Sequence, residues 1–377
     1  TTYGYSGNVD VSRSALPVAF YSTNTITNFP YGRIGTLNNP SLRWEKNGQL
    51  NFAIDFATKK QILSGNIEYY RKKGTDLYGA TPYDYTAWGS TDVLTKNVAG
   101  MEGSGIEIGL TSRNVVGNFN WTSKFYFNYL ENKTTVYYEE SAQDVSGLIT
   151  GGTAIMPIIG KPLYAIAAYK WAGLTATGDP AGYFEKQIST DYSKIIAQDG
   201  KKGFEEGSFT YIGTAIPTYF GSLINEFEWK GLSVAVNIAY RLGYYFRRPV
   251  FTSSELINRG NGHKDYEKRW QQPGDELITN VPAFVYTNYP QFIYRDDFYR
   301  YSEINVLKAD NIRLQYINAS YSLERKNRRL PFQRLTIYGN ISNVGIIWRA
   351  NKEGLDPDSP SSPPSPRTVA VGIRGSF

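Results

Sequence analysis

The clearest pattern in the chain is a pair of alternating hydrophobic and polar runs, residues 219–229 and 232–242, joined at Lys230-Gly231. Side chains two positions apart share one face of a strand, so each run has an apolar face and a polar face. The two-residue connection sets Trp229 opposite Leu232, and a slip of one residue would destroy the match of apolar positions. Each run is also long enough, at about ten residues, to cross a bilayer as a tilted strand. The pattern predicts a β-hairpin whose apolar face meets lipid.

The remaining positions of this hairpin are typical of a membrane barrel. Its polar face carries the side chains that a water-filled interior would hold: Glu226, Glu228, Asn237 and Arg241. Trp229 lies near the turn and Tyr219 and Tyr240 lie at the far end, where the two aromatic girdles of a barrel are found. Asn225, opposite Val236, is the polar exception on the apolar face.

Similar alternation recurs along the chain and predicts about nine strands in all, the further runs being residues 50–57, 63–70, 106–110, 119–129, 317–323, 335–342 and 369–377. Their connections alternate between short turns (59–61, 114–118, 230–231 and 324–334) and long segments (74–103, 131–217, 246–307 and 344–366). Outer-membrane barrels have this asymmetry, with short periplasmic turns and long extracellular loops. Residues 1–40 are rich in Gly, Asn, Ser, Thr and Pro and are expected to form an extracellular loop.

The predicted fold is therefore all-β, a transmembrane antiparallel β-barrel rather than a soluble sandwich. Nine strands is an odd number, whereas bacterial single-chain barrels have even numbers, and an open sheet leaves two bare edges. We therefore expect the chain to be one sector of a larger barrel. The strand at 49–57 and the final strand at 368–377 should each pair with a strand outside this chain.

The amino-acid composition excludes several other classes of protein and of functional site. The 377 residues include 41% hydrophobic and 15% aromatic residues, and no run approaches the ~18 apolar residues of a membrane helix. The absence of cysteine excludes disulfides and thiolate metal sites, and a single histidine, His263, excludes most imidazole chemistry. The net charge is +6, but the basic residues are scattered and the densest cluster, at 325–329, lies in an expected turn. Nucleic-acid binding is therefore not expected.

Eight motifs, in order, resemble the C-terminal portion of the β-barrel of SusC/RagA-type TonB-dependent outer-membrane transporters. They are NNPSLRWEK (38–46), SGNIEYYRKKGTDL (64–77), NVAGMEGSGIEI (97–108), YKWAGLTATGDP (169–180), IPTYFGSLINEFEWKGLSVAVNIAYRLGYYFRR (216–248), RWQQPGDE (269–276), ADNIRLQYINASYSL (309–323) and LDPDSP (355–360), before a final strand ending in Phe377. The chain departs from the pattern at Asn311, where an aromatic residue is common, and at Glu102-Gly103-Ser104.

The resemblance implies that residues 1–377 are part of a 22-strand barrel in the outer membrane of a Gram-negative cell, with the C-terminus in the periplasm. Phe377 would then belong to the signal that the assembly machinery reads, the alternative being an ordinary closing strand. The implied partners are the remaining N-terminal barrel and plug portion, the TonB complex through that plug, a SusD-like lipoprotein, and membrane lipid and lipopolysaccharide. Pairs of transporter and lipoprotein are expected to dimerise.

The implied function is energy-dependent import of an oligomeric nutrient, either an oligosaccharide or a peptide. The competing interpretation is a barrel that anchors or scaffolds a surface complex without transport. No enzymatic activity, catalytic residue, cofactor or metal site is expected. His263 lies deep in a long loop, away from any strand serine that it could activate.

Candidate substrate contacts fall into two sets. Loop aromatics are suited to stack on sugar rings or contact peptides, or else to pack on one another or on the lipoprotein: Tyr83, Tyr85, Trp88, Tyr164, Tyr169 and Trp171, with Tyr183 and Phe184. The second set is Arg241 and Arg313 on the polar face, together with the wall charges Asp55, Glu68, Glu107, Lys124, Glu226, Glu228 and Arg374. Such charges either line a substrate route or solvate the interior and pair across strands, as Glu107 and Lys124 could. Asp179 and Asp356 each precede a proline and are interpreted as turn residues rather than calcium ligands.

Overall fold

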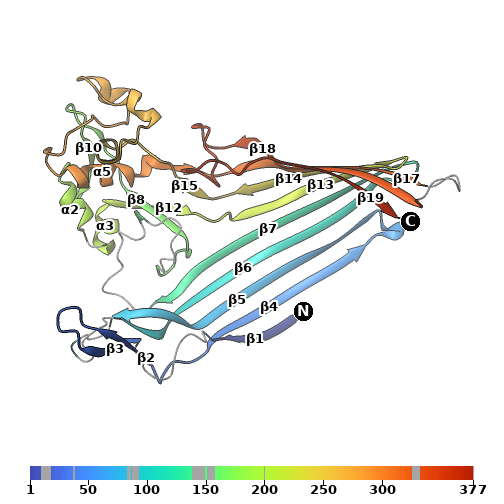
Figure 1. Cartoon of the computed structure of the whole chain (residues 1–377), viewed down its shortest axis with the longest axis horizontal. Helices are drawn as coiled ribbons and strands as arrows, with labels where there is room; N and C mark the ends of the chain where they lie inside the picture. Colours follow the sequence, from blue (N-terminus) through green and yellow to red (C-terminus); the bar gives the residue numbers. More distant parts are fainter. Residues whose placement is uncertain are drawn as a thin grey trace.

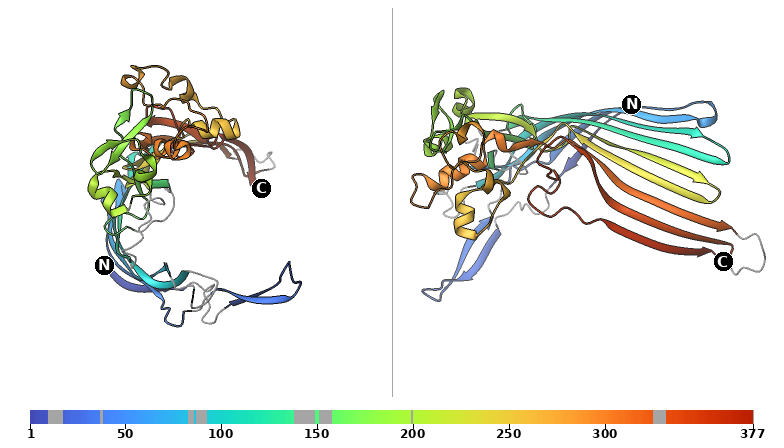
Figure 2. Two further views of the ribbon diagram at one scale, coloured as in Figure 1. Left: turned by 90° about the vertical axis from the view of Figure 1, so that its left-hand side faces the viewer. Right: turned by 90° about the horizontal axis from the view of Figure 1, so that it is seen from above.

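A computed structural model describes residues 1–9, 18–36, 39–82, 86, 93–137, 149–150, 158–198, 200–324 and 332–376. Its main feature is a ten-stranded antiparallel sheet with the strand order β1-β4-β5-β6-β7-β13-β14-β17-β18-β19 (Figure 1). Seen end-on, the sheet is an open arc (Figure 2). The strands are β1 (Thr2–Asn8), β4 (Glu45–Ala57), β5 (Leu63–Pro82), β6 (Val93–Val115), β7 (Phe119–Tyr137), β13 (Tyr219–Trp229), β14 (Leu232–Leu242), β17 (Asn311–Glu324), β18 (Arg334–Arg349) and β19 (Thr368–Ser376).

The hairpin β13–β14 has the predicted register. Trp229 pairs with Leu232 and Leu223 with Ile238, with no irregularity along the whole ladder. Lys230 and Gly231 both have positive φ, 47° and 87°, as the two central residues of a type I′ hairpin turn require. The turn chemistry and the alternation therefore specify the same pairing.

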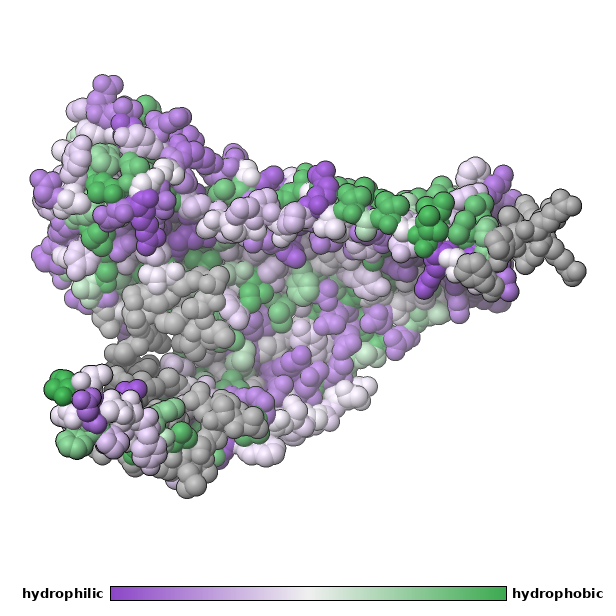
Figure 3. All heavy atoms as spheres, in the orientation of Figure 1, coloured by the Kyte–Doolittle hydropathy of each residue, from purple (hydrophilic) through white to green (hydrophobic). Residues whose placement is uncertain are grey.

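Apolar side chains form continuous rows along one face of the sheet. One row joins Val236 to Asn225 on β13 and to Ile317 on β17, and Ile317 pairs in turn with Ile341 on β18. None of the four β-strand side chains Leu223, Val234, Val236 and Ile238 is buried in a protein core. Hydrophobic residues gather over β17, β18 and β19 on the visible side of the molecule (Figure 3). This face is the one expected to meet lipid.

The exception at Asn225 is satisfied locally. Its Oδ1 accepts hydrogen bonds from Trp121 Nε1 at 3.0 Å and from the Ser123 hydroxyl at 2.7 Å. Both partners lie on β7, next to β13. The amide therefore bonds to its neighbours on the apolar face, where no water is available.

The height of the apolar band matches a bilayer. Tyr219 and Trp229 lie at the two ends of β13 and are both exposed. Ten residue intervals at about 3.4 Å, tilted by about 40°, separate them by about 26 Å along the barrel axis. Outer-membrane barrels have an apolar band about 25 Å tall. Among the described residues, no helix is long and apolar enough to cross a membrane.

The structure corrects the prediction for residues 1–40. Thr2–Asn8 form β1, which pairs with β4 from Asn51 to Glu45, so the edge of β4 is paired in part within this chain. A separate hairpin, β2 (Val18–Thr23) and β3 (Pro30–Thr36), follows. Glycine and serine interrupt the apolar alternation of these strands, so their composition suggested a loop.

The segment 74–103 was also predicted as a loop, and most of it is strand. β5 continues to Pro82 and β6 begins at Val93, and the pairing of the two strands has register shifts near Leu77. Strands that rise beyond the lipid need no apolar face, so the alternation that marks the membrane part is absent there. The sheet therefore has long β-extensions at the end with the long connections, here called the loop end.

Within the described residues the sheet is not closed, because β19 pairs only with β18 and β1 only with β4. This arrangement fits a barrel sector. The pairing of β19 with a strand outside this chain stays a prediction. Phe377 and most of the basic turn at 324–334 lie outside the described residues.

The long connections β7–β13 and β14–β17 form a compact body at the loop end, here called the loop domain (Figure 1). Its strands are β8 (Ala165–Tyr169), β9 (Gly173–Leu174), β10 (Pro180–Phe184), β11 (Gln187–Ser189), β12 (Phe209–Thr214), β15 (Tyr245–Arg247) and β16 (Val306–Lys308). Its helices are α2 (Tyr192–Ile196), α3 (Gly200–Glu206), α4 (Ser253–Arg259) and α5 (Phe292–Arg300), with short 3-10 turns η3 (Lys264–Lys268), η4 (Asp275–Leu277) and η5 (Glu303–Asn305); a further turn, η1 (Lys59–Gln61), joins β4 to β5. Phe298 of α5 lies at the centre of its core and is fully buried.

Candidate functional site

The connection from β18 to β19 folds back onto the polar face of the wall. Its first residue is tied to β17 through the Ala350 amide, which donates to the Asp310 carbonyl at 2.9 Å. Asn351 then bonds both the amide and the carbonyl of Leu355, and the Asp358 amide donates to the Asp356 carboxylate at 2.9 Å. These local bonds present two carboxylates, Asp356 and Asp358, to the strands beneath. We call residues 350–367 the return loop.

Arg313 and Arg241, both predicted as polar-face arginines, meet these carboxylates. Arg313 on β17 makes a two-pronged contact with Asp356 and reaches Asp358 at 3.2 Å. Arg241 on β14 bonds Asp358 at 2.6 Å. The structure therefore brings the two predicted arginines together through the LDPDSP motif. Their direct partners are carboxylates of the chain itself.

Asn311, at the position where an aromatic residue is common in the transporters that the chain resembles, holds Arg313 in place. Its side chain is fully buried and donates to the Tyr244 hydroxyl at 2.8 Å, while its Oδ1 accepts from Arg313 Nε at 3.1 Å. Arg313 is itself only 7% exposed. The amide thus orients the guanidinium toward the return loop.

The Asp356 carboxyl is held ionised. Its burial alone would raise its pKa, but hydrogen bonds from the Arg313 guanidinium and the Asp358 amide outweigh burial and lower the pKa below its ordinary value. A charge-assisted, two-pronged arginine–carboxylate contact is among the stronger polar interactions in proteins. It fixes the return loop against the wall.

A cavity of about 540 Å³ lies between the return loop and the loop end of β17 and β18. Three arginines line it, Arg313, Arg349 and Arg367, against one carboxylate, Asp356, and the rest of its lining is a mixture of serines, prolines, glycines, one asparagine and apolar side chains. Arg349 donates to the Gly354 carbonyl and Arg367 to the Val344 carbonyl, at 2.7 Å for the second. Neither guanidinium forms an ion pair with a carboxylate of the described residues, although Arg349 lies close enough to Asp356 to help lower the pKa of that carboxyl. The cavity therefore suits an anionic group.

Sequence reasoning missed Arg349, Arg367 and Asp358. Their only signal was position, since they flank or belong to the connection that carries LDPDSP. The pattern of hydrophobic and polar residues did not indicate that this connection folds back onto the wall.

The aromatic candidates are distributed differently. Tyr169 is 3% exposed and stacks with Phe298 in the loop-domain core, and Trp171 packs against the same ring. These two rings therefore pack on the loops, the alternative left open by the sequence. Tyr164 is half-buried, and its carbonyl accepts from the Ala215 amide at 2.8 Å. Tyr83, Tyr85 and Trp88 lie outside the described residues.

The wall charges also pair in a different way from the one suggested. Lys124 bonds Glu226 on β13 at 2.7 Å, whereas Glu107 lies opposite Glu68 and Asn128. The suggested pair of Glu107 and Lys124 is therefore wrong, because the register places Lys124 opposite Thr111.

Asp179 does more than set a turn. It accepts from Arg295 Nε at 2.7 Å and from the Tyr289 hydroxyl at 2.7 Å, inside the loop domain. His263 lies at the start of η3, where its Nδ1 accepts from the Asp265 amide, and burial lowers its pKa below its ordinary value. In the described part of the chain, no group of acidic or histidine side chains could hold a metal ion.

An open antiparallel sheet with an exposed apolar band and a charged opposite face defines a sector of a membrane β-barrel. Comparison with known proteins supports this class. The chain is 22% identical over 414 residues to the TonB-dependent receptor P26 of Formosa agariphila, and 27% identical over 380 residues to the TonB-dependent receptor P3 of the same organism. These alignments cover 100% and 95% of this chain but 39% and 35% of the relatives, so the chain spans less than half of their length. No family model matches the chain.

Two solved structures have the same fold. The RagAB peptide transporter superposes with a TM-score of 0.75 at 20% identity, and the RagAB peptide importer in the 'open-open' state with a TM-score of 0.72 at 20% identity. Both comparisons cover the whole of this chain, and 40% and 39% of those chains. The resemblance to SusC/RagA-type TonB-dependent transporters is thereby confirmed, since the chain is similar over its whole length to proteins named TonB-dependent receptors and has the fold of part of the RagAB barrel.

Proposed function

We propose that this chain forms part of the wall and the outer loops of a TonB-dependent importer of oligomeric nutrients in the outer membrane. The observation that carries the proposal is the match of the whole chain to RagAB, at a TM-score of 0.75, together with the apolar band on one face of its sheet. In this assignment the loop end lies outside the cell and the short turns face the periplasm. β19 runs toward the turn end, so the C-terminus lies in the periplasm.

The return-loop cavity is our candidate for a substrate contact, and its three arginines favour a substrate that carries carboxylates. Oligopeptides with acidic side chains or a free C-terminus meet this requirement. RagAB, which has the same fold, is a peptide transporter, and this supports a peptide over an oligosaccharide. Acidic oligosaccharides are the alternative that the same cavity would accept.

Uptake by cells that carry the complete transporter tests this assignment. Removing two cavity charges with the double substitution Arg349→Gln and Arg367→Gln should lower uptake of a labelled acidic oligopeptide by about tenfold, because neither arginine is held in an ion pair with a described carboxylate and both can therefore bind the substrate's carboxylates. Uptake of a neutral oligopeptide of equal length should change less than about twofold. The double substitution Lys59→Gln and Lys60→Gln, which removes two cations from the short turn between β4 and β5 at the opposite end of the wall, is the matched control.

The same experiment separates the alternatives. Preferred uptake of an acidic oligosaccharide would replace the peptide assignment. Deletion of the whole locus with no nutrient phenotype, but with loss of a surface assembly, would favour an anchoring barrel without transport.

We also propose that a SusD-like lipoprotein covers the loop domain, and that the missing barrel strands, plug and TonB contact belong to the complete transporter. Exposed apolar side chains support a covering partner: Leu277, Ile278, Tyr286 and Tyr294. Leu277 and Ile278 are adjacent and 86% and 84% exposed. Purification in mild detergent should recover the lipoprotein and dimers of the pair, and the substitutions Leu277→Asp and Ile278→Asp should reduce that recovery.

A further inference from the structure

The outer face of the wall carries a group of cations just beyond a row of tyrosines. Tyr69, Tyr129 and Tyr219 lie at the loop end of the apolar band, and Tyr69 and Tyr129 both pair with Ile106. Two to six residues further toward the loop end, on the same face, the side chains become basic. We call this group the basic belt, and its members are Lys46, Arg71, Lys73 and Lys133.

The pleat places the belt on the outside of the wall. Residues 67, 69, 71 and 73 alternate without a register shift, so Arg71 and Lys73 share the face of Ile67 and Tyr69. Lys133 lies directly opposite Glu102, which in turn lies opposite Lys73. Lysines on β5 and β7 thus lie on either side of one carboxylate on β6.

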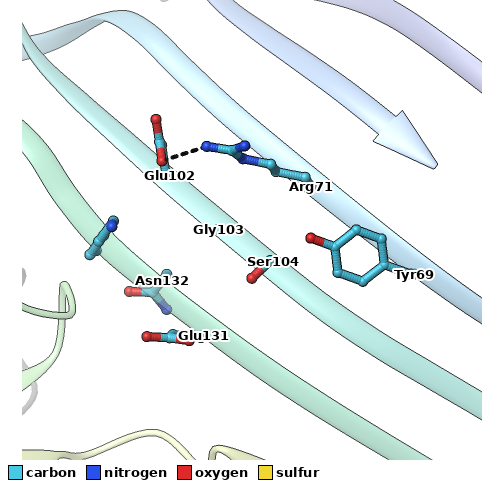
Figure 4. Close-up of a pocket in the computed structure, with 8 residues that line it drawn as sticks. Tyr69, Arg71, Glu102, Gly103, Ser104, Glu131 and Asn132 are labelled. Atoms are coloured by element: carbon cyan, nitrogen blue, oxygen red, sulfur yellow. Dashed lines mark hydrogen bonds and ion pairs between the residues drawn. The ribbon is translucent and has the colours of Figure 1, made fainter. Parts of the chain in front are cut away.

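Two carboxylates, Glu102 and Glu131, neutralise only part of the positive charge of the belt. Glu102 bonds Arg71 at 3.1 Å (Figure 4) and Lys73 at 3.7 Å, while Glu131 accepts from the Tyr129 hydroxyl. The side chains of Arg71 and Lys73 are 58% and 62% exposed, whereas that of Glu102 is 21% exposed. Four cations and two carboxylates give a formal charge of +2, with the cations nearest to the surroundings.

A shallow cavity of about 230 Å³ lies among these side chains. It is lined by Tyr69, Arg71, Glu102, Ser104, Glu131 and Lys133, together with Gly103 and Asn132 (Figure 4). The guanidinium of Arg71 and the hydroxyl of Ser104 are donors suited to a tetrahedral oxyanion. The cavity is therefore open and bordered by an aromatic ring, with two cations and two carboxylates in its lining, and Lys73 of the belt lies beside it, opposite Glu102.

The height of the belt matches the headgroup layer. Arg71 and Lys73 lie two and four residues beyond Tyr69, which is about 7 and 14 Å along a strand. A strand tilt of about 40° reduces this to about 5–11 Å above the aromatic girdle. Headgroups occupy about 5–8 Å on each side of the hydrocarbon core.

We propose that the basic belt binds the phosphate of an anionic lipid in the outer leaflet, with the lipid's acyl chains lying along the apolar rows below Tyr69. The inference rests on the proposed orientation, in which the loop end faces outward. Arg71, Lys73 and Lys133 supply the charge, and Tyr69 borders the sugar or glycerol portion. The phosphate shares these cations with Glu102.

Native mass spectrometry of the complete transporter in detergent tests the proposal. The probes are phosphorylated lipid A, the same lipid A with its phosphates removed, phosphatidylglycerol and inorganic phosphate. The variant R71Q/K73Q/K133Q removes three belt cations, and K59Q/K60Q/K230Q removes three lysines from the turns at the opposite end as a matched control. We expect the belt variant to bind phosphorylated lipid A at least about tenfold more weakly, because each cation near a membrane surface contributes attraction, and the control to stay within about twofold.

The other probes decide the source of the phosphate. Removing the phosphates from lipid A should weaken its binding to the unaltered protein by the same factor. Inorganic phosphate that binds as tightly as the lipid would overturn the lipid assignment. A preference for phosphatidylglycerol over lipid A that the belt variant loses would support the belt and identify its lipid as a glycerophospholipid. Equal binding of lipid A by the belt variant and the unaltered protein would overturn the site itself.

Two readouts keep this test separate from the import proposal. A single cysteine at the exposed Leu277, in a chain that has no other, should react with an impermeant reagent on intact cells if the loop end faces outward. Nutrient uptake by the belt variant should remain near normal, because the belt lies on the opposite face from the return-loop cavity. Loss of uptake with unchanged lipid binding would count against import and not against the belt.

Discussion

The wall and the loop domain bury their apolar side chains in opposite ways. Among the described residues, the buried apolar side chains all lie between Ile149 and Ala309, in the loop domain and its junctions, and the ten-stranded sheet contributes none of them. The wall exposes its apolar residues instead, with Val371 77% and Ile54 67% exposed. One chain thus contains a water-soluble architecture with a core and a membrane architecture without one. The difference teaches that apolar side chains are placed by the solvent that each region meets.

Aromatic residues show the same contrast. In the loop domain Tyr169, Tyr192 and Trp171 gather around Phe298, and their ring centroids lie 5.4–6.4 Å from it. In the wall, Trp229 and Tyr219 lie at the strand ends and are about half exposed. Rings in the first group hold a fold together, and rings in the second anchor it at an interface.

The largest effect is expected from the ion pair at the centre of the loop domain. Arg295 is 1% exposed, bonds Asp179 at 2.7 Å and donates to the carbonyls of Gly178 and Ala283. Arg295→Met leaves a buried carboxylate without its cation, which costs about 3–5 kcal/mol. Hydrogen exchange of the complete transporter should show the loop domain opening while β13 and β14 remain protected.

The exposed pair of Arg300 and Glu255 provides the control for that substitution. Their side chains are 29% and 39% exposed, so Arg300→Met should cost less than about 1 kcal/mol. If Arg295→Met loosened wall and loop domain together, the two regions would be one cooperative unit and the comparison would fail.

The second largest effect is expected from charged substitutions on β14, where the cost should differ between the two faces of the strand. Val236 belongs to an apolar row at mid-height, and Val236→Arg should destabilise the barrel by about 2–4 kcal/mol because it exposes a charge to hydrocarbon. Asn237→Arg, at the adjacent position on the polar face, should be tolerated. Unfolding by guanidinium in lipid vesicles measures both, and equal costs would contradict the assignment of the faces.

How far the sequence predicts the molecule depends on the same contrast. In the wall each strand repeats a two-residue rule, so the register of β13 and β14 followed from residues such as Trp229 and Leu232 and a two-residue turn. The loop domain has no such repeat. Which ring meets Phe298 depends on contacts between segments more than 100 residues apart, as between Arg295 and Asp179. Tyr169 and Trp171 were therefore recognised as notable without a way to tell stacking on a ligand from packing in a core.

The candidate site shows the same limit. Arg241 and Arg313 were identifiable because they break a polar face of small and amide side chains, a local property. Their partners on the return loop were not identifiable, because nothing local specifies where a proline- and serine-rich connection will lie. β1 was missed for a related reason, since its glycines conceal the alternation of Tyr3 and Tyr5.

A smaller effect is expected from the polar exception of the apolar face. Asn225→Ala leaves Trp121 Nε1 and the Ser123 hydroxyl without their shared acceptor. Side-chain hydrogen bonds inside membranes contribute about 0.6 kcal/mol on average and up to about 1.7, so a cost of about 1 kcal/mol is expected. A double-mutant cycle with Ser123→Ala measures the coupling, and additive costs would show that the bond contributes nothing.

The smallest effect is a pH response of the return loop, which joins the two regions at the polar face. Because the folded pKa of Asp356 is lowered, its contribution is fully present above the ordinary aspartate pKa of about 3.9 and is lost as pH falls through the lower folded value. Protonation removes the charge that Arg313 binds, so the loop should leave the wall while the strands stay paired. Hydrogen exchange at the Asp358 and Ser359 amides, corrected for intrinsic rates, should accelerate below about pH 4 in the unaltered protein. Asp356→Asn, which carries no charge at any pH, should exchange faster at neutral pH and lose this dependence, and a variant that kept it would assign the response to Asp358 or another carboxyl.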